Sequence, residues 1–480
     1  MTSEIYQVLS EKFGYHSFKV GQEEIIKAVL EKVDVIGILP TGMGKSLCYQ
    51  LPAYLMPHPV LIISPLLSLM QDQVEQMKLF GEKKVIALNS LLLPNDKHQI
   101  LTQLSTYKFI FISPEMFMQP QVLAALTQTP ISLIVADEVH CISQWGYDFR
   151  PDYLRLGDVF RNWNRPPILA LTATATSKVL DDISHFLHLK QPKTVIQSLD
   201  RPNIRYKAIP IQHADEKYEM LLQQITTYEG PGIIYTQSRK KADEYALKLK
   251  EAGFRAASYH AGMEVMDRTL VQQQFANHEL EWVCATNAFG MGVHKSNIRQ
   301  VIHDHIPSSI ASYSQEVGRA GRDGEDAIAT LFFSPDDEDM TIFISTNDFP
   351  DRFQVNQFLQ QDNPKTLVDD GLLSDTMYRI LTYWLEKHSE AETVQIMENL
   401  RNEKIRQIYL MKELLTNSKC IRQQLVSFFG QTLTNTTSNC CTVCGIRDDE
   451  VLKTRSIEVF SDNGLNWNER LARIFNIEQP

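Results

Sequence analysis

Short apolar runs alternate with longer polar or amphipathic stretches over much of the chain. Between about residues 33 and 200, these runs are VDVIGILP, VLIISP, FIFISP, ISLIVADE and PILALTAT. The rhythm returns in GIIYTQ, AASYHAG, EWVCATN and RQVIHDHIP, with helical patterns at 238–251 and 264–277. Strands that alternate with helices are typical of a parallel sheet covered on both faces. The pattern therefore predicts an α/β fold with two tandem parallel-sheet domains.

The domain boundaries follow from changes in this rhythm. The polar, proline-bearing segment SLDRPNIRY at 198–206 separates the two sets of strands and is the expected linker. After about residue 336 the strand signal fades, and 366–429 show helical spacing of apolar residues before a Thr/Asn-rich loop at 431–439. We expect a first domain at 1–200, a second at 201–335, a helical module at 336–446 and a short tail at 447–480.

The composition says more about where the protein is located than about whether it binds nucleic acid. No apolar run approaches the roughly 20 residues of a membrane span, and Glu4 interrupts the only place where a signal peptide could begin. We therefore expect a soluble, cytoplasmic protein with no membrane partner. The net charge of −11 argues against a nucleic-acid partner when taken alone. A local groove of backbone amides and a few cations can nevertheless hold a nucleic-acid strand.

A glycine-rich turn lies between an apolar strand and a probable helix in IGILPTGMGKSLCYQ. The residues of this turn are Thr41, Gly42, Gly44, Lys45 and Ser46. Turn amides and a helix N-terminus would converge there on anionic phosphate, with Lys45 reaching the β- and γ-phosphates of ATP and Ser46 binding Mg²⁺. The strict motif has a glycine where this chain has Leu39, so a chance turn is the competing interpretation.

Two adjacent carboxylates directly follow the apolar run ISLIV, in VADEVH. Buried carboxylates at the end of a strand are costly unless they serve a cation. Asp137 would bind Mg²⁺ through water, and Glu138 would act as the general base for the attacking water. His140 would pass the phosphate state onward, and a satisfied structural histidine is the alternative for it.

With these motifs the chain resembles a superfamily 2 helicase, and the surrounding segments resemble the RecQ family. FGYHSFKVGQEEII resembles that family's adenine-recognition motif, which implies that Tyr15 stacks on the base and Gln22 recognises its edge. Lys19 stands where the family usually has arginine. Lysine keeps the charge but lacks the planar guanidinium group of arginine. LIISPLLSLMQDQV is similar to the first strand-contacting motif, which implies DNA contacts from Ser64 and Gln73.

The segment CISQWGYDFRPDYLRL resembles the aromatic-rich loop that couples DNA to ATP hydrolysis in RecQ enzymes. Trp145, Tyr147, Phe149 and Arg150 offer stacking faces and a cation, which suit single-stranded bases. The alternative is that Trp145 and Phe149 are core aromatics. LTATAT at 171–176 resembles the motif that links hydrolysis to domain movement.

In the second half, YTQSRKKAD, SYHAGM, CATNAFGMGVHK and SYSQEVGRAGRDG follow in the family's order. The resemblance implies DNA contacts from Ser238, Arg239 and Thr286, and RecA-like folds for both domains. Gln315, Arg319 and Arg322 are spaced to share one helical face, which could direct two guanidiniums at the γ-phosphate across a cleft. Surface salt bridging is the alternative for the arginines.

Four of the seven cysteines lie close together in the sequence, and they are Cys420, Cys440, Cys441 and Cys444. Four thiolates can close a tetrahedral structural zinc site, and the clustering favours metal over disulfides in a chain without an export signal. RecQ proteins usually space the last three as C-x-x-C-x-x-C. Here Ser438 occupies the first of those places, and the loop is expected to absorb the shift. Free buried thiols are the alternative.

The resemblance implies a helicase that uses ATP, Mg²⁺ and Zn²⁺ and moves 3′ to 5′ on single-stranded DNA, and we expect it to be a monomer. It would unwind tailed or forked duplexes in recombination and repair, beside a single-stranded-DNA-binding protein or other repair proteins. We also expect an additional helical insert before Cys420 and no room after Cys444 for the winged helix of longer relatives. Two competing functions are an RNA-directed helicase and an ATP-gated DNA-binding or annealing factor with weak unwinding.

Overall fold

The protein is described by a computed structural model that covers residues 2–65, 67–89, 92–143, 151–213, 216–290, 295–433, 438–448 and 451–455. The proposed base-contacting residues Trp145, Tyr147, Phe149 and Arg150 lie outside these described residues. No helix in the described ranges, including the longest of 27 residues, is long and apolar enough to cross a bilayer.

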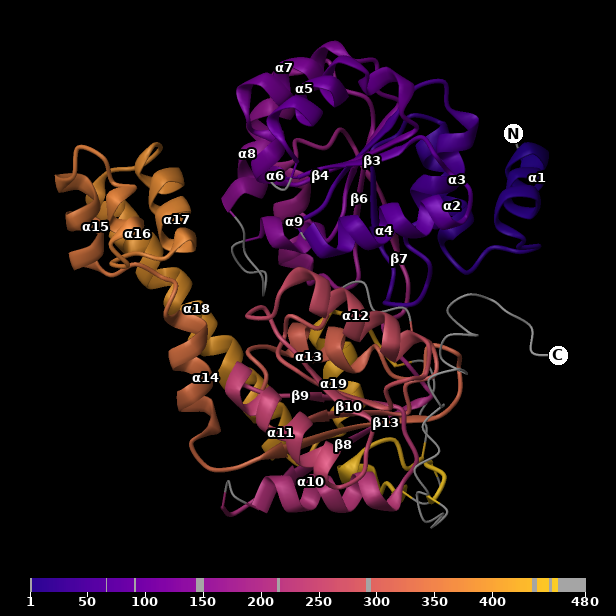
Figure 1. Ribbon diagram of the computed structural model, residues 1–480, viewed down its shortest axis with the longest axis vertical. Coiled ribbons are helices and arrows are strands. Elements are labelled where there is room, and N and C mark those ends of the chain that lie inside the picture. Colours follow the sequence, from indigo (N-terminus) through magenta and orange to yellow (C-terminus); the bar gives the residue numbers. More distant parts are fainter. Residues whose placement is uncertain are drawn as a thin grey trace.

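A seven-stranded parallel sheet organises the first part of the chain, in the order β3-β4-β2-β5-β6-β1-β7 (Figure 1). Its strands are β1 (Val35–Ile38), β2 (Val60–Ile63), β3 (Val85–Leu88), β4 (Phe109–Ile112), β5 (Leu133–Ala136), β6 (Ile168–Thr172) and β7 (Lys193–Ile196). The helices around it are α1 (Thr2–Phe13), α2 (Gln22–Leu30), α3 (Leu47–Leu55), α4 (Leu67–Leu79), α5 (Pro94–Thr102), η1 (Leu104–Thr106), α6 (Pro114–Phe117), α7 (Pro120–Gln128), η2 (Val139–Ile142), α8 (Pro151–Asn162) and α9 (Ser177–Phe186).

Burial explains which strands the sequence revealed. Every residue of β1, β2, β4, β5 and β6 is buried, so each strand is a continuous apolar run, as expected when helices cover both faces. These five predicted strands are confirmed. The sequence did not reveal the two edge strands, since β3 is only partly buried and β7 buries Val195 alone.

A six-stranded parallel sheet follows, in the order β10-β11-β9-β12-β13-β8. Its strands are β8 (Ile204–Pro210), β9 (Gly232–Tyr235), β10 (Ala256–Tyr259), β11 (Trp282–Ala285), β12 (Gln300–His303) and β13 (Ala327–Phe333), with helices α10 (Glu216–Thr227), α11 (Arg239–Glu251), α12 (Val265–Ala276) and α13 (Ile310–Val317). The four strands and two helices expected here are confirmed. The expected linker is shorter than predicted, because its last three residues begin β8, an edge strand with alternating burial.

Most of the described residues from 337 to 428 are helical, as expected from their apolar spacing. The helices are α14 (Asp337–Thr346), α15 (Arg352–Gln360), α16 (Thr366–Asp369), α17 (Asp375–Leu385), α18 (Glu390–Thr416) and α19 (Ile421–Phe428), with the 3-10 helix η3 (Thr442–Cys444). A capping box formed by Ser389 and Glu392 starts α18 by satisfying its first backbone N–H groups.

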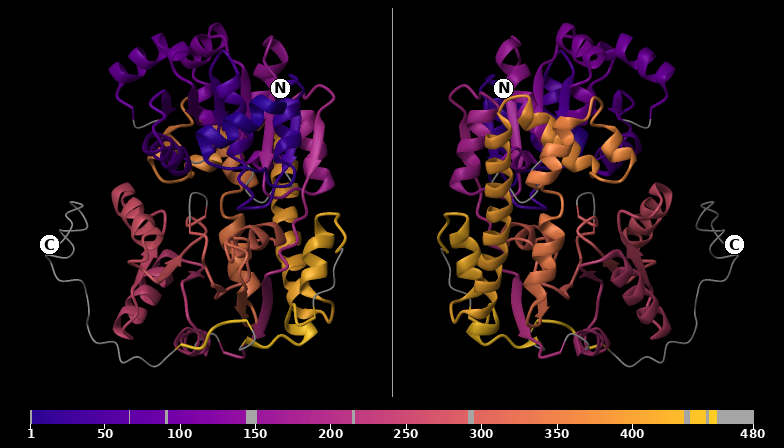
Figure 2. Two further views of the ribbon diagram at one scale, coloured as in Figure 1. Left: turned by 90° about the vertical axis from the view of Figure 1, so that its right-hand side faces the viewer. Right: turned by 90° about the vertical axis from the view of Figure 1, so that its left-hand side faces the viewer.

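Helix α18 links the cores of the two sheet domains. The lobe of α15–α17 lies beside the first domain, and α18 runs from this lobe toward the second (Figures 1 and 2). Trp384 of α17 and Met397 near the start of α18 belong to the first domain's core, whereas Met411 and Leu414 near its end belong to the second domain's core. A single rigid element therefore contacts both domains.

The cysteine-rich segment extends the second sheet. The Tyr206 N–H of β8 donates to the Cys440 carbonyl at 3.1 Å, and the Ala208 N–H donates to Thr442 Oγ1 at 2.8 Å. Because β8 is an edge strand, this segment covers backbone groups that would otherwise lack partners.

Candidate functional site

The predicted phosphate loop joins β1 to α3. Gly42 and Gly44 have φ angles of 85° and 72°, a left-handed conformation that glycine adopts without a steric penalty. Ser46 occupies the N-cap position of α3, so the loop leads directly into a helix N-terminus, which favours anions. The backbone here has the form expected of a phosphate site.

Two of the proposed adenine-recognition residues, Lys19 and Gln22, lie against this loop. Lys19 Nζ donates to the Gly42 carbonyl at 2.8 Å, and Gln22 Nε2 donates to the Gly44 carbonyl at 3.1 Å. Gln22 Oε1 accepts the Lys19 N–H at 2.9 Å. Tyr15 is 58% exposed and can receive a base, whereas Gln22 would have to exchange its present bonds to contact adenine.

The two predicted carboxylates lie at the carboxyl end of β5, next to Lys45. Lys45 Nζ donates to Glu138 Oε1 at 2.8 Å. Burial raises the pKa of Glu138, but the charge and hydrogen bond of Lys45, together with the charges of His140 and Arg319, hold the pKa below its ordinary value. Burial and the neighbouring charge of Glu138 raise the pKa of Asp137 to about 6. The charge of Lys45 thus neutralises Glu138, but at Asp137 it is outweighed by burial and by the charge of Glu138.

Glu138 has a left-handed backbone, with a φ of 47°. This conformation is uncommon for a residue with a side chain and is concentrated at functional sites. The strained residue turns the chain from β5 into η2, whose buried His140 places Nδ1 3.5 Å from Glu138 Oε2 and 2.9 Å from Thr172 Oγ1. His140 therefore joins the proposed general base to the LTATAT segment.

A residue that the sequence did not single out supports these carboxylates. The buried Tyr153 of α8 donates its hydroxyl to the Asp137 carbonyl at 2.6 Å. Tyr153 lies near the start of α8, which follows the aromatic-rich segment in the chain. A tyrosine within an amphipathic helix gives no local sign of such a contact.

The arginines of the second domain approach the phosphate loop of the first. Thr41 Oγ1 donates to the Gly318 carbonyl at 3.0 Å, and a β-carbon placed on Gly42 would lie 3.2 Å from Cγ of Arg322. The charge of the buried Arg319 also helps to lower the pKa of Glu138. The site is therefore composed of both domains.

Burial and the neighbouring guanidiniums of Arg319 and Arg201 lower the pKa of Arg322 to about 9. Cations gathered in a buried place favour an anionic ligand, since a bound anion would relieve their mutual repulsion. The γ-phosphate of ATP has the required charge.

The expectation that Gln315, Arg319 and Arg322 share one helical face is wrong. Helix α13 ends at Val317, and both arginines lie in the turns that follow. The helix stops at Gly318, and Gly321 has a positive φ of 54°, which ends helical geometry. Gln315 remains on α13, and its buried Nε2 has no hydrogen-bond partner within the described ranges.

The proposed DNA contacts gather where parallel strands end, the edge at which open α/β sheets bind ligands. Ser64, Ser238 and Thr286 lie just beyond β2, β9 and β11, while Gln73 lies on α4 and Arg239 begins α11. Ser238 caps α11 by accepting the Lys241 N–H. Ser64 is buried, so its hydroxyl lies beneath the surface that DNA would contact.

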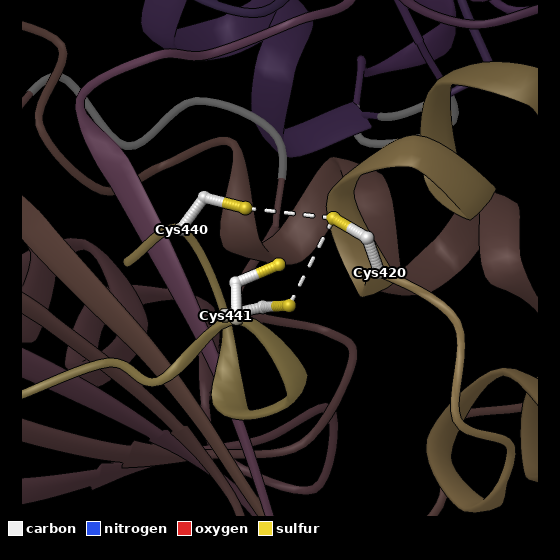
Figure 3. Close-up of side chains that lie close together, drawn as sticks. Cys420, Cys440 and Cys441 are labelled. Atoms are coloured by element: carbon white, nitrogen blue, oxygen red, sulfur yellow. Dashed lines mark hydrogen bonds between the residues drawn. The ribbon is translucent and has the colours of Figure 1, made fainter. Parts of the chain in front are cut away.

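The four clustered cysteines converge at the start of α19, beside the edge strand β8 (Figure 3). Their sulfur atoms, from Cys420, Cys440, Cys441 and Cys444, lie within 4.8 Å of one another. The sulfur of Cys420 lies 3.4 Å from that of Cys440 and 3.9 Å from that of Cys441. Zinc–sulfur bonds of about 2.3 Å in a tetrahedron place sulfurs about 3.8 Å apart. The donor set therefore fits a structural zinc ion.

Comparison with known families and proteins gives consistent results. Residues 19–183 match the DEAD/DEAH box helicase family, and residues 216–324 match the helicase conserved C-terminal domain. The chain is 39% identical over 491 aligned positions to the probable ATP-dependent DNA helicase RecS of Bacillus subtilis, covering 99% of both chains. It is 45% identical over 336 positions to the ATP-dependent DNA helicase RecQ of Haemophilus influenzae, covering 69% of this chain and 53% of that protein.

Among solved structures, the helicase MrfA bound to DNA superposes with a TM-score of 0.58 at 17% identity, covering 76% of this chain and 55% of MrfA. At that identity the likeness shows the shared fold alone.

Proposed function

The chain belongs to the RecQ family of ATP-dependent DNA helicases, and we propose that it separates duplex DNA by moving 3′ to 5′ along one strand, as part of recombination and repair. The observation that carries this proposal is the composite site, in which the phosphate loop and carboxylates of one domain meet Arg319 and Arg322 of the other. A site divided in this way can convert phosphate chemistry into domain movement.

In the proposed reaction, the loop amides and Lys45 bind the phosphates of ATP. Lys45 is paired with Glu138 in this structure, so an arriving phosphate would compete for its ammonium group and release the carboxylate. The freed Glu138 can then orient the attacking water and accept its proton. Arg319 and Arg322 would stabilise the charge that develops on the γ-phosphate.

Oxygen donors suited to Mg²⁺ are present at Ser46 and Asp137. The raised pKa of Asp137 fits this assignment, because a bound cation would supply the balancing charge that the protein does not. Bound there, Mg²⁺ would neutralise phosphate charge. The zinc module would be structural, since four thiolates leave no open position for catalysis.

Single-stranded DNA would cross the carboxyl ends of both sheets, near Ser238, Arg239 and Thr286. Gln73 would contact it from α4, and the buried Ser64 would lie beneath that surface. We propose domains at 1–200 and 201–335, followed by the helical module at 336–446. This division assigns one sheet to each domain, because β7 ends at Ile196 and β8 begins at Ile204.

Strand displacement on matched substrates tests the function. With ATP and Mg²⁺, we expect unwinding of a duplex with a 3′ single-stranded DNA tail, and little unwinding of a 5′-tailed or blunt duplex. RNA should stimulate ATP hydrolysis much less than DNA. Preferential unwinding of the 5′-tailed duplex would refute the polarity, and stronger stimulation by RNA would favour an RNA-directed enzyme.

A further inference from the structure

Residues 318–322 form a turn, here called the arginine turn, that carries Arg319 and Arg322. This turn is held by a residue of the interdomain connection, which is the segment 197–203 between β7 and β8. Arg201 donates to three carbonyls of this turn: Nη1 to Gly318 at 3.1 Å, and Nη2 to Ala320 at 3.0 Å and to Gly321 at 2.7 Å. These carbonyls flank Arg319 and immediately precede Arg322. The Gly318 carbonyl also accepts the hydroxyl of Thr41, so the connection and the phosphate loop meet on one atom.

The connection is in turn held by the helix that begins at the candidate zinc site. Arg422 of α19 is 1% exposed, and its Nε donates to Asp200 Oδ1 at 2.7 Å. Its Nη2 donates to the Arg201 carbonyl. A second contact comes from Gln431, whose Oε1 accepts the Leu199 N–H at 2.9 Å. The zinc module thus contacts Leu199, Asp200 and Arg201, and Arg201 in turn holds the arginine turn.

We propose that Arg201 and Arg422 are positioning residues, which transmit the placement of the zinc module through the connection to Arg319 and Arg322. The planar fork of arginine suits this role, because one guanidinium can hold several carbonyls at fixed angles. A displacement of about 1 Å at a catalytic group can slow a reaction by about a hundredfold. The inference rests on the proposed function, since it requires these arginines to act on ATP.

The first experiment compares Arg201→Ala with Arg205→Ala, a matched control. Arg205 belongs to the same segment but contacts Pro202 and Asp326 instead of the arginine turn. We expect Arg201→Ala to lower the DNA-stimulated kcat by at least about tenfold, while affinity for a non-hydrolysable ATP analogue stays within about twofold. Zinc content should be unchanged in both variants, and Arg205→Ala should match the wild type.

Arg201→Lys provides a rescue test that a purely structural role would not satisfy. Lysine keeps the charge but cannot span three carbonyls, so its kcat should fall between those of the wild type and Arg201→Ala at equal melting temperature. Asp200→Ala, which removes the partner of Arg422, should lower kcat in the same direction. The double variant Asp200→Ala/Arg201→Ala should be little slower than Arg201→Ala, because residues in one relay are not additive.

A kcat for Arg201→Ala equal to that of Arg205→Ala would overturn the inference, as would a loss of nucleotide affinity at constant kcat. If the effects of Asp200→Ala and Arg201→Ala on kcat multiplied in the double variant, the contact between Arg422 and Asp200 would act independently of the arginine turn. The proposed positioning role of Arg422 would then be wrong. These failures differ from a failure of the proposed function, which would appear as wild-type protein that hydrolyses no ATP in the presence of DNA.

Discussion

Asp137 and Asp304 occupy matching places in the two sheets but have opposite surroundings. Each directly follows a central strand, and each backbone N–H donates to the last carbonyl of the neighbouring strand, that of Ile63 for Asp137 and that of Tyr235 for Asp304. Asp304 is paired with Lys241 at 2.8 Å and with His305 at 3.0 Å. Burial would raise the pKa of Asp304, but these partners lower it to about 2, whereas the pKa of Asp137 is raised to about 6.

The difference shows how one topology supports two roles. In the second domain the strand-end carboxylate is neutralised by the protein and serves the fold. In the first domain the charge of Lys45 does not offset the burial of the equivalent carboxylate, and a bound cation would recover the cost of that burial. We therefore expect the first domain to bind the nucleotide and the second to direct Arg319 and Arg322 toward the phosphate loop.

The largest effect is expected from the first domain's phosphate contact. Lys45→Ala removes the cation that would bind the phosphates and also leaves Glu138 without its partner. Both binding and hydrolysis of ATP should be lost, with the hydrolysis rate falling by more than about a thousandfold. Equilibrium binding of a fluorescent ATP analogue, beside steady-state hydrolysis with DNA, measures both. If Lys45→Ala bound the ATP analogue normally, the first domain would not bind the nucleotide in the way proposed.

Arg322→Ala separates the two domains' contributions. Hydrolysis should fall by about a thousandfold because charge on the γ-phosphate is no longer stabilised, while nucleotide affinity changes by no more than a few fold. The same binding and rate measurements apply. If affinity fell as far as it does in Lys45→Ala, the division between a binding domain and a completing domain would be wrong.

The two aspartates can be compared directly by unfolding. Asp304→Asn removes the buried carboxylate that pairs with Lys241 and His305, and it should lower the unfolding free energy by about 2 kcal/mol. Asp137→Asn should raise the unfolding free energy of the nucleotide-free protein by on the order of 1 kcal/mol at pH 7. The sign follows because a folded-state pKa above the unfolded value means that the ionised group destabilises the fold at that pH. Equal destabilisation by both substitutions in urea titrations would contradict the comparison.

The smallest effect is expected where the helical lobe meets the first domain through exposed ion pairs. Arg155 pairs with Glu386 at 2.9 Å, and Asp158 pairs with Lys387 at 2.8 Å. Glu386→Ala and Lys387→Ala should each lower the unfolding free energy by roughly 0.2–1 kcal/mol, because solvent screens these charges. A loss near that of Asp304→Asn would show that these pairs matter as much as the buried one.

The sequence predicted the features that are local in the chain. The interior strands of the first sheet, the glycine-rich turn, the paired carboxylates and the cysteine cluster each leave a signature within a few residues, although the buried strand β13 was not predicted. Of the edge strands, β10 was predicted, whereas β3, β7 and β8 were not, because β3 is only partly buried, β7 is polar and the alternation of β8 lay within a polar segment. The helical assignment of Arg319 and Arg322 was wrong because Gly318 and Gly321 end the helix.

Contacts between distant positions could not be predicted in the same way. Tyr153 reaches the Asp137 carbonyl, Arg201 reaches the arginine turn and Arg422 reaches the interdomain connection only after the chain has folded. An isolated arginine in a polar segment is usually a solvated surface residue, so nothing near Arg201 in the sequence marks its role.

The central claim is that ATP hydrolysis in the interdomain cleft drives separation of DNA strands. The most direct measurement is displacement of a labelled strand from a 3′-tailed duplex by the wild type with ATP, by the wild type with a non-hydrolysable analogue, and by Arg322→Ala with ATP. We predict displacement in the first reaction alone. Displacement at the wild-type rate with the analogue, or by Arg322→Ala, would contradict the account.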